Sequence, residues 1–222
     1  MDDLHKNFWA DEKRTRRRSP FNPVVEAFVW PKIDFLIKNA PDALGKTILD
    51  VGCGNGFFTC HLAKHFDVTG LDFSAAMLKM NPHKKVVLGS VYDIPFADES
   101  FDVVFCSDLL HHLDDPKKAL SEMKRVSKKY VAVSEPNRNN PLMFVFSALF
   151  SEERGALKFS KKYLLDLFAG QKLQLLDIMV AGMIFPNKTP EAVLPVFKKF
   201  DFNFPFGGYI TAIAKNHEDS PG

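Results

Sequence analysis

The chain has 222 residues, and its content of 46% hydrophobic and 25% charged residues is that of a globular protein, which excludes extensive disorder. Its 29 lysines and arginines nearly balance its 27 aspartates and glutamates, so no general basic field is present to hold nucleic acid or an anionic membrane. Phenylalanine is unusually frequent, with 22 residues. Much of the hydrophobic content is therefore bulky and carries no polar group.

Residues 1–20 are predicted to form a polar, basic arm, since they include the cluster KRTRRR at 13–18. We expect this arm to be solvated, and the alternative is an arm that contacts phosphate or closes over a site. It lacks the apolar region of a secretory signal. No apolar run reaches the roughly 18 residues of a membrane-spanning helix, so no transmembrane segment is expected. Residues 21–222 are expected to form a single domain.

The cysteines show neither a metal-binding nor a disulfide pattern. They are Cys53, Cys60 and Cys106, and their spacing contains no CxxC and no Cys/His zinc motif. An odd number of cysteines in a chain of this size is typical of a reduced protein. We therefore expect a cytoplasmic protein without a bound metal.

The first predicted helix spans residues 22–39, where apolar residues recur at helical spacing. Pro31 lies inside this pattern, so a kink or two shorter helices are expected. From residue 47 to residue 135, strand and helix patterns alternate. The strands are predicted at 47–51, 67–73, 84–90, 101–107 and 129–135, and the helices between them at 56–66, 75–80 and 116–126. This alternation predicts a parallel, doubly wound α/β sheet.

The alternation ends near Pro141, and residues 142–150 are apolar on nearly all sides. Four further elements are predicted after this run: a helix at 161–170, a strand at 174–182, a short helix at 190–200 and a strand at 207–215. Such a late strand pair adds an antiparallel edge. The expected fold is therefore a mostly parallel seven-stranded sheet with an antiparallel C-terminal edge, and with helical cap segments at about 21–44 and 138–170.

A glycine-rich turn, DVGCGNG, follows the first strand and opens the next helix. Its glycines Gly52, Gly54 and Gly56 permit positive φ angles and a close approach between a ligand and backbone N–H groups. The pattern is not the GxGxxG of dinucleotide sites, because Phe57 stands where a glycine is required. The phosphate loop GxxxxGK[ST] is absent as well. Asp50 precedes the turn, and a carboxylate there would repel a pyrophosphate but suits a ligand with an ammonium and a sulfonium.

The second predicted strand ends at Asp72, 16 residues after Gly56. An acidic side chain at that edge of a sheet can accept hydrogen bonds from both hydroxyls of a ribose. The alternative is a capping role beside Ser74, which is the predicted N-cap of the helix that follows. Together with the glycine turn, Asp72 predicts a nucleoside site.

Four segments in this order, LDVGCGNG, LDFS, GSVYDIPF and SDLLHHLDDP, resemble the class I S-adenosylmethionine-dependent methyltransferases. The resemblance covers about residues 45–137 and is greatest to the small-molecule branch with the ubiquinone- and menaquinone-type (type 11) methyltransferases. It implies a Rossmann-like methyltransferase fold, S-adenosyl-L-methionine as the cofactor, and methyl transfer to a small molecule. Nucleic acid is not expected as a partner.

The resemblance also implies ten cofactor-binding residues. They are Asp50, Gly52, Cys53, Gly54 and Gly56 around the methionine part, Asp72 at the ribose, Phe73, Ser90 and Val91 near the adenine, and Ser107 beside the methionine part. The family usually has an acidic residue where this chain has Ser90. A hydroxyl is a less selective partner for the adenine amino group than a carboxylate, and Asp93 is the alternative partner.

Methyl transfer from a sulfonium depends mainly on alignment of the acceptor and exclusion of water. A general base is needed only for a weakly acidic acceptor. The catalytic candidates are His111 and then Glu135, which follow the predicted fourth and fifth strands. The alternatives are helix packing for His111 and a structural role as acceptor of loop amides for Glu135. Arg138 is expected either to bind an acidic group of the substrate or to be solvated.

The apolar runs at 142–150 and 197–208 are candidates for the roof of an acceptor pocket, and ordinary core packing is the alternative. A roof of this kind would favour a lipid-like, prenylated or aromatic acceptor. The rival functions are a methyltransferase that acts on RNA or protein and a module that binds S-adenosylmethionine without catalysis. The [DNS]PP[YFW] motif of base amino-methylation is absent after the fourth strand. The broken dinucleotide pattern disfavours a nicotinamide oxidoreductase.

Overall fold

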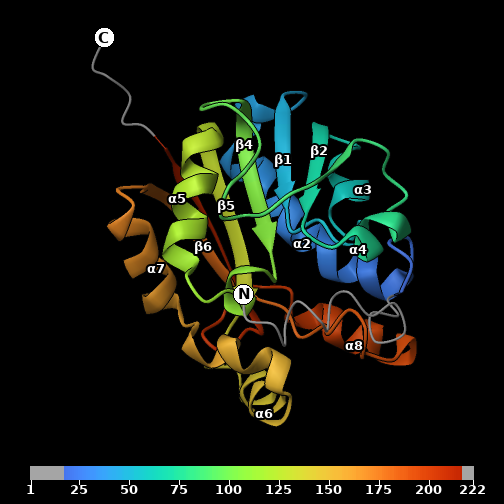
Figure 1. Cartoon of the computed structure of the whole chain (residues 1–222). Coiled ribbons are helices and arrows are strands. Elements are labelled where there is room, and N and C mark those ends of the chain that lie inside the picture. The colour runs from blue at the N-terminus through green and yellow to red at the C-terminus, as the bar shows by residue number, and fades with distance from the viewer. Residues whose placement is uncertain (1–17, 217–222) are drawn as a thin grey trace.

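The computed structural model describes residues 18–216, which Figure 1 shows in colour. Most of the expected arm, residues 1–17, lies outside the described residues. We expected a solvated arm, but Arg18, the last arginine of its basic cluster, is half-buried and hydrogen-bonded to the protein. Its guanidinium donates hydrogen bonds to the carbonyl oxygens of Pro186 (3.1 Å) and Thr189 (2.8 Å). The end of the arm is therefore attached to the segment 186–189.

In the described part of the chain, seven strands form one sheet in the order β3-β2-β1-β4-β5-β7-β6. The strands are β1 (Thr47–Val51), β2 (Asp67–Asp72), β3 (Val86–Leu88), β4 (Phe101–Ser107), β5 (Ser127–Pro136), β6 (Gln174–Ala181) and β7 (Tyr209–Lys215). Strands β1 to β5 pair in parallel, whereas β7 is antiparallel to both β5 and β6. The expected doubly wound sheet with an antiparallel C-terminal edge is confirmed.

The order of the strands places a topological switch point between β1 and β4. The chain proceeds from β1 outward to β3 on one side, and from β4 to β5 on the other. Open α/β sheets bind ligands outside the carboxyl ends of the strands at such a point. The fold therefore directs the search for a site to the turn after β1 and the ends of β2 and β4.

Helices lie on both faces of the sheet (Figure 1). They are α2 (Pro23–Asn39), α3 (Thr59–Leu62), α4 (Ala75–Met80), α5 (Pro116–Val126), α6 (Pro141–Leu149), α7 (Lys161–Gly170) and α8 (Leu194–Phe197). Apolar side chains of α2 and α3 belong to one core cluster, and those of α5 and α7 belong to another on the opposite face. α6 and α8 lie beyond the carboxyl ends of the parallel strands. The segment 21–44 is thus part of a layer over the sheet, and α6 supplies the cap.

α2 is one continuous helix through Pro31, so the expected kink or break is wrong. A proline removes one backbone hydrogen bond and costs about 3 kcal/mol in a helix interior. However, nine of the 17 residues of α2 are buried. Burial of a large apolar side chain stabilises by about 1.5–3 kcal/mol. Packing against the sheet therefore outweighs the loss at Pro31.

Two other predicted helices are shorter than expected. α3 has four residues. Gly56 has a φ of +92°, which a helix does not accommodate, and residues 63–65 form turns before β2 begins at Asp67 as expected. The segment 190–200 is divided into α8 and two flanking 3₁₀ segments, η4 (Glu191–Val193) and η5 (Lys198–Phe200). Pro195 stands in the first turn of α8, where proline favours a helix start over continuation of a preceding turn.

Three more 3₁₀ segments complete the fold: η1 (Pro41–Ala43), η2 (Leu110–His112) and η3 (Ser151–Lys158). η3 follows α6 and packs against both α6 and η2. It therefore brings part of the cap down onto the loop after β4. No helix within residues 18–216 is long and apolar enough to cross a membrane.

Candidate active site

The glycine turn after β1 is held to the end of β2 by hydrogen bonds. The amides of Gly52 and Cys53 donate to the carbonyl oxygen of Leu71, at 2.7 and 3.0 Å. The amide of Gly54 donates to Oδ2 of Asp72 at 2.8 Å. Gly52 and Gly54 have φ angles of +74° and +49°, which a residue with a Cβ rarely adopts. The turn is therefore fixed beside Asp72, the predicted ribose-binding residue.

Two buried carboxylates, Asp50 and Asp72, flank this turn. Asp72 also accepts from the amide of Ser74 (2.8 Å), and Ser74 caps α4 as expected by accepting from the amide of Met77 (3.2 Å). Asp50 accepts from Oγ1 of Thr59 at 2.6 Å. Burial raises the pKa of both carboxyl groups, and that of Asp50 reaches about 7. A cationic ligand beside them would favour their ionised forms, and the two acids would in turn bind it.

A cavity of about 470 Å³ opens where β1, β2 and β4 end. Seven of the ten predicted cofactor residues line it: Asp50, Gly52, Cys53, Gly54, Asp72, Phe73 and Ser107. Gly56 does not. The position of its missing Cβ faces Asn81, whose Oδ1 would be only 2.5 Å away. Gly56 therefore has a packing role that the sequence did not predict.

The two remaining residues, Ser90 and Val91, line a second cavity of about 310 Å³. This cavity shares Gly52, Asp72 and Phe73 with the first one. The predicted ribose residue thus lies where the two cavities meet, with the predicted adenine residues on one side and the predicted methionine residues on the other. The arrangement suits one elongated ligand.

Glu135 is fully buried at the end of β5 and does not line the first cavity. Its Oε1 accepts from the amides of Leu109 (3.1 Å) and Leu110 (2.8 Å). Its Oε2 accepts from the amide of His111 (3.3 Å) and lies 2.6 Å from Nδ1 of the same residue. Both oxygens are thus engaged by the loop after β4. The geometry favours the structural alternative for Glu135, which positions His111 and does not reach a substrate.

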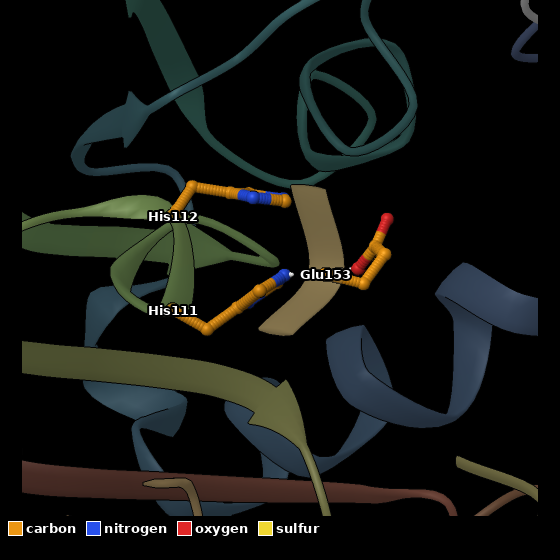
Figure 2. A group of neighbouring side chains, drawn as sticks. All are labelled: His111, His112 and Glu153. Carbon is orange, nitrogen blue, oxygen red and sulfur yellow. Dashed lines mark hydrogen bonds and ion pairs between the residues drawn. The ribbon is translucent and has the colours of Figure 1, made fainter. Parts of the chain in front are cut away.

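His111 lies between the carboxylates of Glu135 and Glu153, of which Figure 2 shows the second. Its Nδ1 faces Glu135, and its Nε2 lies 3.3 Å from Oε2 of Glu153. Burial lowers the pKa of His111, but the charges and hydrogen bonds of the two carboxylates outweigh this effect and raise the pKa to about 10. The ring of His112 lies against that of His111 at an interplanar angle of 43°, with centroids 3.8 Å apart. His111, His112 and Glu153 all line the first cavity.

Asp108 also lines this cavity, although it was not among the predicted site residues. Its φ of +52° is uncommon outside glycine, and such backbone conformations cluster at functional sites. Oγ of Ser107 donates to its carboxylate at 3.0 Å. Burial raises the pKa of Asp108 to about 6, although the charges of Lys32 and His111 oppose this rise.

Lys32 is a buried charged residue that was not among the predicted site residues. It lies in α2, with Nζ over the rings of Phe28 (3.3 Å to the centroid) and Tyr209 (4.2 Å). Burial lowers its pKa to about 7, although the charges of Asp108 and Asp201 raise it. Because Phe28 and Tyr209 line the first cavity, Lys32 supports its wall from behind.

Seven further residues of the cavity wall are aromatic. They are Phe28, Phe57, Phe58, Phe146, Phe150, Phe185 and Tyr209. Phe146 belongs to α6 and Phe150 follows it, in agreement with the roof expected over 142–150. The run 197–208 does not line the cavity. The amide of Phe204 donates to Val180, and the amide of Val180 donates to Asn203, which holds this run against β6.

Arg138 was expected either to bind an acidic group of the substrate or to be solvated. Its guanidinium donates to the carbonyl oxygen of Leu157 at 3.3 Å, and the residue lines neither cavity. The segment 185–188 takes part in the wall of the first cavity, and no sequence motif marked it. A loop that is distant in the chain therefore replaces the predicted second half of the roof.

Comparisons with known proteins agree with this architecture. Residues 49–132 match the methyltransferase domain family. Demethylmenaquinone methyltransferase of Staphylococcus aureus (strain MRSA252) is 30% identical over 210 residues, which are 90% of this chain and 84% of the relative. The protein of the same name from Staphylococcus haemolyticus is 31% identical over 186 residues, with 79% and 75% covered.

Solved structures share the fold at low sequence identity. A methyltransferase of Thermotoga maritima, described as a possible histamine N-methyltransferase, superposes with a TM-score of 0.63 at 18% identity, covering 87% of this chain and 98% of the other. Magnesium protoporphyrin IX methyltransferase of Synechocystis gives 0.60 at 14% identity, covering 86% and 84%. The chain therefore belongs to the class I S-adenosylmethionine-dependent methyltransferases, in the branch that methylates small molecules with S-adenosyl-L-methionine as cofactor.

Proposed function

We propose that the acceptor of this methyltransferase is a small molecule with an apolar body and a hydroxylated ring, of the quinol type. The single observation that carries the proposal is the composition of the first cavity. One end has the predicted cofactor residues, and the other combines aromatic rings with the polar group of His111, His112 and Glu153. The relatives from Staphylococcus are named for demethylmenaquinone, an acceptor of this chemistry.

The cofactor is assigned across both cavities. Asp50 and the backbone of Gly52, Cys53 and Gly54 hold the methionine part, and Ser107 lies beside it. Asp72 accepts from the ribose hydroxyls, and Phe73, Ser90 and Val91 surround the adenine. What supports this assignment is that these residues line two adjoining cavities that share Asp72. Gly56 is left out of direct contact, since it packs against Asn81.

The chemistry is an in-line displacement. The S–CH₃ bond breaks with its electron pair going to sulfur, which leaves S-adenosylhomocysteine, and a nucleophilic atom of the acceptor forms the new bond to the methyl carbon. A ring hydroxyl that has lost its proton is nucleophilic at its oxygen and at the adjacent ring carbon. Glu153 accepts the proton of this hydroxyl, His111 hydrogen-bonds to the hydroxyl oxygen, and Glu135 positions His111. The aromatic wall excludes water, which favours the loss of charge in the transition state.

The proposal includes a reducing, cytoplasmic setting, which the three free cysteines support. The test is methyl transfer from radiolabelled S-adenosylmethionine to a panel of acceptors. A reduced prenylated naphthoquinone is expected to be methylated, whereas histamine and total RNA are not. Higher turnover with histamine or RNA than with the quinol would contradict the proposed acceptor. Binding of S-adenosylhomocysteine, measured by calorimetry, separates failure of the acceptor from failure of the cofactor site.

A further inference from the structure

We propose that His111, His112 and Glu153 form a binding site for one divalent transition-metal ion of the zinc class, at the acceptor end of the first cavity. The three residues each offer a ligand atom, and these atoms lie within 4.8 Å of one another. The ligands come from two short segments, η2 and η3 (Figure 2), and Glu153 lies 42 residues after His111 in the chain. Two imidazoles and a carboxylate are a donor set that zinc and its neighbours prefer.

The spacing of the first two ligands agrees with coordination. Nε2 of His111 and Oε2 of Glu153 are 3.3 Å apart. Two ligands bound at about 2.0–2.1 Å with a tetrahedral angle are about 3.3 Å apart. The pair is therefore already spaced for a shared ion. His112 completes the group from the neighbouring position of η2, with its ring tilted by 43° against that of His111.

Hydrogen bonds orient both imidazoles for such a role. Nδ1 of His111 lies 2.6 Å from the carboxylate of Glu135, and Nδ1 of His112 lies 3.0 Å from the carbonyl oxygen of Glu152. Both partners are acceptors, so each Nδ1 donates its hydrogen there, and Nε2 is the ring nitrogen that would coordinate a metal. Histidines that bind metals almost always donate their other N–H to a carboxylate or a carbonyl in this way.

The backbone keeps the two segments together. A Cβ on Gly155 would lie 1.7 Å from the carbonyl oxygen of His111. Only glycine at this position lets η3 rest directly on η2, and this contact brings Glu153 to the imidazoles. The charge also fits a cation, since the carboxylates of Glu135 and Glu153 lie 2.6 and 3.3 Å from the two ring nitrogens of His111.

Three protein ligands leave at least one position of the ion open, which is typical of catalytic sites. That position faces the cavity, because all three residues line it. An ion there would bind the acceptor's oxygen and make its hydroxyl more acidic. This role in methyl transfer rests on the proposed function, whereas binding of the ion does not.

The test uses the full chain after removal of metals with a chelator. Zn²⁺ is titrated by calorimetry, and Co²⁺ serves as a spectroscopic probe because its visible absorption reports the ligand set. We expect one ion per chain. Glu153→Gln should weaken Zn²⁺ binding at least tenfold and change the Co²⁺ spectrum, and His112→Ala should do the same. Glu152→Gln is the matched control. The carboxylate of Glu152 is outside the proposed ligand set, and the substitution keeps the backbone carbonyl that contacts His112.

Each outcome decides the matter. Absence of stoichiometric Zn²⁺ binding by the wild type overturns the proposal, and so does binding that Glu153→Gln and His112→Ala leave unchanged. In either case His111 and Glu153 form an ion pair only. The titrations contain neither cofactor nor acceptor, so their failure leaves the proposed methyl transfer intact. Conversely, a chain that binds Zn²⁺ through these residues but methylates no quinol contradicts the proposed function alone.

Discussion

Replacing Gly155 with alanine is expected to damage both the stability and the active site. The added Cβ would be placed 1.7 Å from the carbonyl oxygen of His111, whereas ordinary contacts begin near 3.4 Å. The two segments must therefore separate by about 1.7 Å at this point. Both sides of the contact are backbone, so no side-chain rotation relieves it.

The size of the effect follows from this displacement. Overpacking of a well-packed interior costs about 1–3 kcal/mol, and occasionally more. Because backbone must move, we expect a loss of about 3 kcal/mol in the free energy of unfolding, measured by urea denaturation. The displacement would also carry Glu153 beyond its 3.3 Å separation from His111. Turnover of the acceptor should fall at least tenfold, while binding of S-adenosylhomocysteine, whose predicted residues lie outside η2 and η3, should be retained.

Gly170→Ala is the matched control. Gly170 is the last residue of α7, and a Cβ there would meet no atom within 4 Å. Alanine is favoured over glycine in a helix by roughly 0.5–1 kcal/mol, so this variant should be at least as stable as the wild type. If Gly155→Ala unfolds at a urea concentration no lower than that of the wild type, the close approach of η3 to η2 is refuted.

Three further predictions concern the cofactor, a buried charge and the acceptor. Asp72→Ala should weaken S-adenosylhomocysteine binding at least tenfold by calorimetry, because the ribose loses a charged acceptor; Asp67→Ala, at the exposed start of the same strand, should not. Lys32 has a folded pKa of about 7 against 10.5, so the wild type should gain stability between these values, by at most about 1.4 kcal/mol per pH unit. In urea titrations, Lys32→Met should lack this rise of the unfolding free energy with pH. Relative to the wild type, the variant should be stabilised most below pH 7. Phe146→Ala should raise the KM for an apolar quinol roughly tenfold, equivalent to about 1.4 kcal/mol, whereas Phe144→Ala, exposed on the same helix, should leave the KM unchanged.

The sheet was predictable because its signals are local. Thr47–Val51 is an apolar run followed directly by a glycine turn, and the runs that became β2 and β4 are likewise short and largely apolar. Such patterns report burial on both faces of a parallel sheet. The continuous α2 was not predictable in this way. Whether a helix passes through Pro31 depends on how much of it is buried by the rest of the protein.

In the candidate site, too, some residues were predictable from local motifs and others were not. Asp50, Asp72 and the glycine turn lie in sequence motifs, and the structure brings them to one cavity. Glu153 reaches His111 from 42 residues away, and Lys32 acts on Asp108 from a helix that precedes the first strand. No local sequence pattern encodes these long-range interactions, because they depend on how η3 and α2 pack against the sheet.

The buried carboxylate of Glu135 has a consequence for how this enzyme adapts to new acceptors. Three successive amides of the loop after β4 donate to it, so their hydrogens should exchange with solvent as slowly as those of a central strand. This side of the acceptor pocket is effectively an extension of the sheet. Changes of substrate preference during evolution should therefore accumulate on the facing side, in α6 and in the segment 185–188, where replacing a side chain disturbs no buried ionic group.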